Sequence, residues 1–151
     1  MKLGFRLKHH FFGAFREIFV HHHGSLEFRA KIFALLIAAC PSSKVDNYIL
    51  VKKLSEEIYI GDLDRANLLM LSTKEIVQKV KDNNGLDLDT LVESIQKELK
   101  IVPRYAKKID IESLKPFLAI PHNQDVIDYQ KNILEFLKTI KDDTLKIYNK
   151  G

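Results

Sequence analysis

The sequence predicts an all-α protein, folded as a compact single-domain bundle of seven or eight helices. Apolar residues recur at helical spacing through almost all of its 151 residues, and no segment shows the sustained apolar–polar alternation of a strand. Turn formers such as Pro41, Gly61, Gly85 and Pro121 separate the periodic segments. Because a chain of this length buries about 68–70% of its unfolded surface, it can build a core without disulfides.

The first 31 residues differ from the rest in charge and composition. They hold six Lys/Arg and two Glu, whereas the remainder holds 18 of each sign, so the net charge of +4 belongs to this end. Leu7, Phe11, Phe15 and Phe19 lie at helical spacing, which predicts a helix over about 5–22. We therefore expect residues 1–24 to form an extra N-terminal helix that is basic and rich in Phe and His.

No segment of the chain has the features of a membrane span or an export signal. Arg16 and Glu17 interrupt the apolar stretch near the N-terminus, and the longest apolar run covers nine residues, 32–40. A spanning helix needs about 20 apolar residues, and a secretory signal needs an unbroken apolar stretch. We expect a cytoplasmic protein, with attachment to the surface of the inner membrane as the alternative.

The helix predicted over 26–40 is expected to form the centre of the core. Its apolar residues cover nearly every side, which is typical of a helix surrounded by others. Ser25 is a suitable N-cap, and Pro41 stops the helix. Cys40, the single cysteine, is expected to be a small buried apolar residue, since nothing in the sequence indicates a partner that would activate it.

Three more helices are predicted next. They cover 45–59, 63–81 and a segment that starts after Asp87 or Asp89 and ends near residue 99. Gly61 is expected just past the end of the first, and Asp62 is expected to cap the second. The turn at 82–85 ends that helix, and Asp87 or Asp89 caps the third.

The last third of the chain predicts shorter elements and then one strong helix. A basic segment over 104–108 follows Pro103, and Asp110 caps a helix over 111–119, where Pro116 introduces a kink or marks the true start. The strong helix covers 125–140, and Asp142 with Asp143 predicts a separate short helix or linker over 142–151. The main domain is thus expected over 25–141.

The residues that carry chemistry point away from an enzyme. His21, His22 and His23 are contiguous, so on a helix they point about 100° apart, and none of the six histidines has a partner four residues away. Phosphate-binding glycine motifs, a nucleophile elbow and a Cys/His zinc pattern are missing. We predict no catalytic residue and no cofactor; an enzyme with unrecognised residues is the alternative.

The basic N-terminal segment predicts a contact with another molecule. Six cations spread over 31 residues and accompanied by a Phe stripe fit poorly to nucleic acid. Such a stripe fits a protein partner, self-association or a membrane surface, and packing on the protein's own body is the competing interpretation. The candidate interface residues are Phe11, Phe15, His21, His22 and His23.

The order of parts over 26 to about 140 resembles a TerB-like domain, the all-helical fold named for bacterial tellurite resistance. The segments that carry the resemblance are IFALLIAAC, KVDNYILVKKLSEEIY, RANLLMLSTKEIVQKV and LDLDTLVESIQKELK, followed by LKPFLAI leading into QDVIDYQKNILEFLKTI. The last two of these segments are similar in pattern to the first two. The same fold precedes the J domain in a class of membrane-associated DnaJ-like co-chaperones.

The chain departs from the acidic motif of that family, D-G-x-[IV]-x-x-x-E, in both copies. The first copy reads Ser-Ser-Lys-Val over 42–45 with Ile49 in place of Glu, and the second reads Asn-Gln-Asp-Val over 123–126 with Gln130 in place of Glu. Family members that bind a divalent cation use those acidic positions. We expect no metal here; Asp46, Asp125 and Asp128 are the weak candidates.

The resemblance implies a non-catalytic protein-interaction module. Such a module is the N-terminal domain of a DnaJ-like co-chaperone or a stress-response adaptor. The chain holds no His-Pro-Asp, so these residues do not act as a J domain, and a continuation into one past Gly151 stays open. The alternatives are a peripheral membrane-binding domain and a degenerate divalent-metal sensor.

Overall fold

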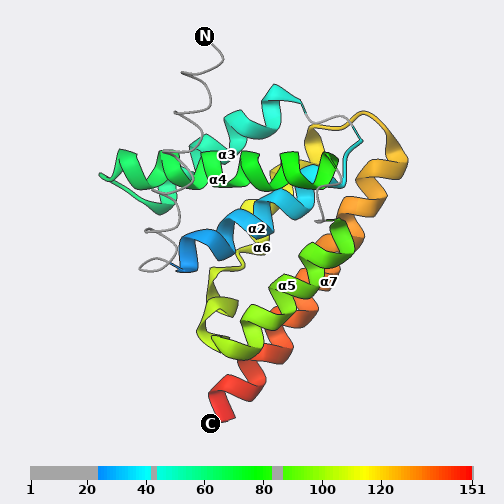
Figure 1. Cartoon of the computed structure of the whole chain (residues 1–151). Helices are drawn as coiled ribbons and strands as arrows, with labels where there is room; N and C mark the ends of the chain where they lie inside the picture. The colour runs from blue at the N-terminus through cyan, green and yellow to red at the C-terminus, as the bar shows by residue number, and fades with distance from the viewer. Residues whose placement is uncertain (1–23, 42–43, 83–86, 151) are drawn as a thin grey trace.

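A computed structural model describes residues 24–41, 44–82 and 87–150 (Figure 1). Every regular element within these ranges is helical, which confirms the all-α prediction. The α-helices are α2 (Gly24–Ala38), α3 (Val45–Ile58), α4 (Leu63–Lys81), α5 (Leu88–Ile101), α6 (Ile111–Leu114) and α7 (Gln124–Lys150), and the 3-10 helices are η1 (Pro103–Lys108) and η2 (Lys115–Ala119).

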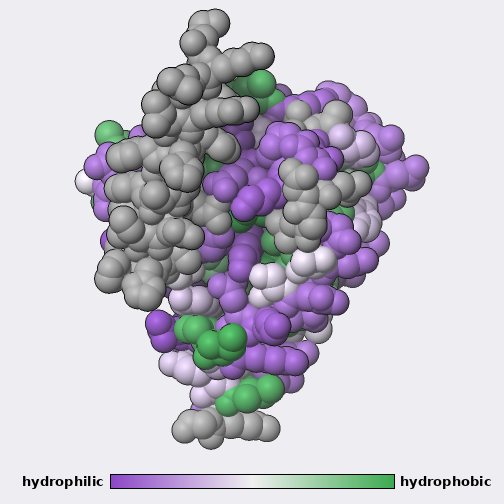
Figure 2. Space-filling view, in the orientation of Figure 1, coloured by the Kyte–Doolittle hydropathy of each residue, from purple (hydrophilic) through white to green (hydrophobic). Residues whose placement is uncertain are grey.

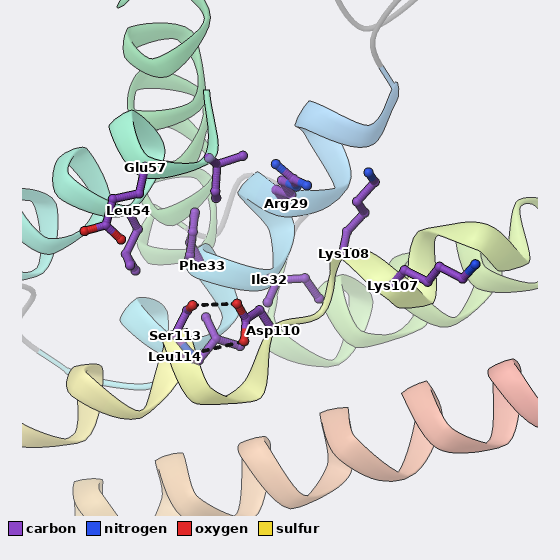
Figure 3. A pocket seen from close by; sticks show the side chains of 11 residues that line it. Arg29, Ile32, Phe33, Leu54, Glu57, Lys107, Lys108, Asp110, Ser113 and Leu114 are labelled. Atoms are coloured by element: carbon purple, nitrogen blue, oxygen red, sulfur yellow. Dashed lines mark hydrogen bonds between the residues drawn. The ribbon is translucent and has the colours of Figure 1, made fainter. Parts of the chain in front are cut away.

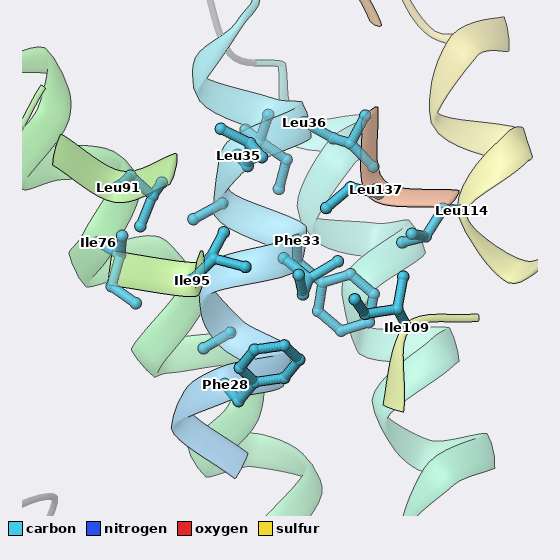
Figure 4. Close-up of a cluster of buried hydrophobic side chains, with 14 of the residues drawn as sticks. Phe28, Phe33, Leu35, Leu36, Ile76, Leu91, Ile95, Ile109, Leu114 and Leu137 are labelled. Atoms are coloured by element: carbon cyan, nitrogen blue, oxygen red, sulfur yellow. The ribbon is translucent and has the colours of Figure 1, made fainter. Parts of the chain in front are cut away.

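Helix α2 lies at the centre of the bundle, as its apolar composition predicts. It contacts α4, α5, α7 and η1, and ten of its 15 residues are buried. Figure 4 shows Ile76 of α4, Leu91 and Ile95 of α5 and Leu137 of α7 around it. The core is therefore built around one helix.

The first turn of α2 differs from the prediction. Gly24 and Ser25 are both helical, so Ser25 lies inside α2 and is not its N-cap. The ring of Phe28 packs on that of Tyr105, with the centroids 5.3 Å apart, and a Cβ added at Gly24 would clash with the Tyr105 hydroxyl. The glycine therefore lets η1 approach the backbone of α2 closely.

The bounds of α3 and α4 agree with the prediction to within one residue. The two helices pack against each other and are joined by a short turn. Gly61 has a positive φ of 79°, which suits a residue without a side chain. The Asp62 carboxylate accepts a hydrogen bond from the Arg65 N–H at 3.1 Å, confirming it as the N-cap of α4. The turn thus fixes where α4 begins.

The segment between α5 and α7 is more broken than predicted. Asp87, rather than Asp89, caps α5 by accepting from the Thr90 N–H at 2.7 Å. The helix expected over 111–119 is divided into α6 and η2. Pro116 explains the division, because it lacks the N–H that an α-helix would need at that position.

Helix α7 corrects the prediction at the C-terminal end. The helix expected to end at residue 140 continues without interruption to Lys150, and no separate helix begins at Asp142 or Asp143. Lys141 donates to the Ile109 carbonyl at 2.6 Å, and α7 packs along η1. These contacts hold the helix together where two aspartates suggested a cap. Among the helices of the described ranges, none is both long and apolar enough to cross a membrane.

Candidate functional site

A pocket of about 300 Å³ lies where α2, α3, η1 and α6 meet (Figure 3). Apolar side chains form its floor, among them Ile32 and Phe33 of α2, Leu54 of α3 and Leu114 of α6. Charged side chains line its mouth: Arg29, Lys107, Lys108, Glu57 and Asp110. An apolar floor below a few charged groups is the usual build of a ligand pocket, and this volume is at the lower end of the usual range.

Arg29 is the most buried of the charged residues that line the pocket. It projects from α2, is half-buried, and its Nε is fully enclosed without a hydrogen-bond partner. The guanidinium carbon lies 5.5 Å from the centre of the Tyr59 ring, which also receives Arg65 at 5.5 Å. In the described part of the chain, no carboxylate forms an ion pair with Arg29. Within that part, the guanidinium therefore contacts the Tyr59 side chain and has no direct carboxylate partner.

Lys108 adds a second cation beside Arg29. Partial burial lowers the pKa of Lys108, and the positive charges of Arg29 and Arg104 lower it further. Figure 3 shows its side chain extending from η1 toward the same side as Arg29. Like charges that repel one another in this way would be stabilised by an anion placed between them.

Asp110 and Glu57 form the opposite, acidic side of the pocket. The Ser113 hydroxyl donates to Asp110 at 2.6 Å and the Ser113 N–H at 3.3 Å. The side-chain hydrogen bond from Ser113 lowers the pKa of Asp110 more than its partial burial raises it. Asp110 therefore keeps its negative charge at neutral pH as the N-cap of α6, and Glu57 is exposed on α3.

This arrangement suits the binding of one anionic group attached to an apolar one. A guanidinium presents parallel N–H donors that match a carboxylate, and a nearby ammonium adds charge. The floor then accepts an apolar group next to that carboxylate. The two carboxylates on the far side repel a second negative charge, so the pocket distinguishes one anionic group from a densely charged polyanion.

The residues that the sequence singled out are not gathered at this pocket. Phe11, Phe15, His21, His22 and His23 lie outside the described residues. Asp46 lies exposed in the first turn of α3, and Asp125 and Asp128 lie exposed at the start of α7, where Asp128 accepts from Gln124 at 2.9 Å. Within 24–41, 44–82 and 87–150, no three His, Cys, Asp or Glu side chains come together as a metal site would require.

Sequence reasoning missed the pocket, although one signal was present. Arg29 and Lys31 are the two cations of the core helix, which also carries Glu27 near its start and is mostly apolar elsewhere. Lys31 has partners, because its ammonium lies 2.8 Å from the Glu98 carboxylate and 2.8 Å from the Ser94 hydroxyl. Arg29 has no such carboxylate. A charge on a core helix requires either a partner or an opening to solvent, and here the opening is the pocket.

Gln130 occupies the position of the final Glu in the second copy of the acidic motif. Its side chain is fully buried, and its amide donates to the Leu36 carbonyl of α2 at 3.1 Å. Its Oε1 has no hydrogen-bond partner. The residue therefore attaches α7 to the end of the core helix through a neutral group.

Comparison of the chain with protein-family models, curated proteins and solved structures finds no match.

Proposed function

We propose that this chain is a non-catalytic, TerB-like protein-interaction module, serving a DnaJ-like co-chaperone as its N-terminal domain or a stress response as an adaptor. We propose further that it binds an acidic segment of its partner protein in the α2–α3–η1 pocket. One observation carries the second step: the half-buried guanidinium of Arg29 has no ion-pair partner in the described part of the chain and faces an open pocket.

The electrostatics favour a bound carboxylate. Burying a charge is costly unless it is paired, and Arg29 is enclosed on one side by α2 and by the Tyr59 ring. A carboxylate that enters the pocket gains charge-assisted hydrogen bonds from the guanidinium and the attraction of Lys108. The partner thus offsets a cost that the free protein bears.

The floor of the pocket specifies the neighbouring group. Phe33, Leu54 and Leu114 offer an apolar surface directly below the cations. A Glu or Asp side chain followed by Leu would place its carboxylate at Arg29 and its apolar side chain on this floor. We therefore expect a short acidic peptide segment with one apolar residue, rather than a run of acidic residues.

The protonation states of the pocket fit binding better than catalysis. Arginine stays positive at every pH that the protein meets, and hydrogen bonding to Ser113 keeps Asp110 negative. Neither group exchanges a proton near neutral pH, which general acid–base chemistry would require. Fixed charges of this kind orient a ligand.

A nitrogen–proton correlation NMR titration tests the proposal. The probe is the peptide acetyl-Gly-Ser-Glu-Leu-Ser-Gly-amide, added to the ¹⁵N-labelled full chain. We expect saturable shifts centred on α2, η1 and α6, and binding weaker by about tenfold or more in Arg29→Gln, because one charge-assisted hydrogen bond contributes about 1.5–3 kcal/mol. Arg65→Gln is the matched control, since Arg65 stacks on the same Tyr59 ring and does not line the pocket.

Two results would contradict the proposal. One is equal binding of the peptide in which Gln replaces Glu, which would remove the role of the carboxylate. The other is equal binding by wild type and Arg29→Gln, which would place the peptide elsewhere on the surface.

A further inference from the structure

The end of the bundle where α5, η1 and α7 finish carries exposed apolar and cationic side chains together. Ile101, the last residue of α5, is 73% exposed, and Ile147 in the last turns of α7 is 74% exposed. Figure 2 shows hydrophobic surface near the C-terminal end among hydrophilic surface. We name this region the basic tip: Lys100, Ile101, Arg104, Lys107, Lys146 and Ile147, of which all four cations are exposed.

Contacts between the three elements give the basic tip a defined shape. Helix η1 packs on both α5 and α7, and Figure 1 shows α5 and α7 side by side toward this end. The Lys107 ammonium lies 5.6 Å from the centre of the Tyr148 ring, and the Arg104 guanidinium lies 5.5 Å from that of Tyr105. Two of the four cations are thus placed by aromatic rings, and the contacts of η1 with α5 and α7 bring the ends of these elements together.

The carboxylates of these elements do not cancel the charge of the basic tip. Glu98 is engaged by the Lys31 ammonium at 2.8 Å. Asp142 and Asp143 lie four and three residues before Lys146, where they offset part of its charge, although no ion pair with Lys146 forms in the described part of the chain. With Glu98 engaged, the four cations of the basic tip exceed these two carboxylates, so this end of the bundle keeps a net positive charge.

We propose that the basic tip is a membrane-contact surface that binds anionic lipid. Two protruding isoleucines enter the boundary between headgroups and acyl chains, and the surrounding cations contact negative headgroups. Charge complementarity selects an anionic membrane, and the isoleucines favour a lipid surface over nucleic acid, whose phosphates gain little from exposed aliphatic side chains. This surface shares Lys107 with the mouth of the pocket, but its other five residues do not line the pocket, and the proposal does not depend on the function proposed above.

Vesicle flotation of the full chain tests the proposal. The vesicles contain about 30% phosphatidylserine in phosphatidylcholine, at about 50 mM salt, and pure phosphatidylcholine vesicles are the lipid control. We expect binding to the anionic vesicles alone and release near 500 mM salt, because exposed charges are screened at that ionic strength. Each cation near an anionic surface strengthens binding by about fivefold.

Two pairs of variants locate the contact. Ile101→Ser with Ile147→Ser should weaken flotation about tenfold, whereas Val45→Ser with Ile49→Ser should leave it unchanged, since these α3 residues are similarly exposed at 73% and 60%. Lys100→Gln, Arg104→Gln and Lys146→Gln together should weaken it at least tenfold, and Lys52→Gln with Lys53→Gln should not. None of the three substituted cations lines the pocket.

Three results would overturn the proposal: no flotation of the wild type with anionic vesicles, tip variants that float like the wild type, or binding lost only in Phe11→Ser with Phe15→Ser. The last result would assign the membrane contact to the Phe-rich N-terminal segment. Peptide binding in the NMR titration is expected to survive in all tip variants, so failure of either proposal is seen separately.

Discussion

Helices α2 and α3 have nearly the same length and opposite surroundings. α2 has 15 residues, of which ten are buried, whereas α3 has 14, of which four are buried. On α3, Val45 and Ile49 are left largely exposed. The comparison teaches that an apolar residue stabilises this fold according to what surrounds it, since the two helices carry similar aliphatic side chains.

The comparison also separates positions that hold the fold together from positions available for other contacts. Leu36 of α2 is fully buried beside residues from α5 and α7, and Ile49 of α3 is 60% exposed. Shortening the Leu36 side chain leaves a cavity in the core, whereas shortening the exposed Ile49 side chain creates no cavity.

Leu36→Ala tests the buried helix and should have the largest effect. We expect a loss of about 2–5 kcal/mol in the free energy of unfolding, because the closely packed surroundings relax only in part. Urea denaturation followed by circular dichroism measures it. Ile49→Ala is the control and should change the value by no more than about 0.5 kcal/mol. Equal effects at the two positions would remove the distinction between α2 and α3.

Gln130→Glu sharpens the comparison by changing one polar contact of α2. The substitution replaces the amide that donates to the Leu36 carbonyl with a buried carboxylate, so we expect a loss of about 2–4 kcal/mol at pH 7. Burial raises the pKa of the new carboxyl above that in the unfolded chain. The deficit should therefore shrink as pH falls through the raised pKa, and urea denaturation at pH 5 and pH 7 measures this. A deficit that grows toward low pH would contradict the account.

Asp110→Ala removes the cap of α6 and should cost about 1 kcal/mol. Hydrogen bonding to Ser113 holds the pKa of Asp110 below its ordinary value of 3.8. The contribution of Asp110 to the free energy of unfolding is thus fully present above pH 3.8. It is lost as the pH falls through the lower pKa that Asp110 has in the folded chain. Thermal unfolding at pH 7 and at pH 3 measures both parts. A difference between wild type and variant that is larger at pH 3 would refute the assignment.

Gly61→Ala should have the smallest of the destabilising effects. The glycine has φ of 79° and a Cβ would meet no atom within 4 Å, so only the backbone conformation opposes the change. We expect a loss of up to about 1 kcal/mol, measured by thermal unfolding. Gly61→Asn is the matched control and should cost less, since asparagine tolerates this conformation better. An alanine variant as stable as the wild type would show that the turn between α3 and α4 relaxes freely.

Much of the fold could be predicted from local sequence. The bounds of α4 agree because Asp62 caps its start and a turn cluster follows its end. The central place of α2 followed from its apolar composition. The continuity of α7 past residue 140 could not be predicted from the sequence around Asp142 and Asp143, because Lys141 and Tyr148 make their contacts there with η1 and the Ile109 carbonyl, which are distant in sequence.

The candidate site was less predictable than the fold. A pocket forms where segments far apart in sequence meet, here Arg29 of α2, Glu57 of α3 and Lys108 of η1. A single sequence shows that Arg29 interrupts an apolar helix, and it does not show which element lies opposite. The residues predicted for a partner interface lie outside the described residues, so that prediction stays open: Phe11, Phe15, His21, His22 and His23.

The hydrogen bond from Gln130 to Leu36 has a consequence for how the chain is made. The two residues are 94 positions apart, and a ribosome adds about 5–20 residues per second. The apolar side of α2 that faces α7 is therefore synthesised about 5–20 s before its cover. During that interval the nascent chain exposes the apolar side of α2, so aggregation or chaperone binding competes with folding until α7 has left the ribosome.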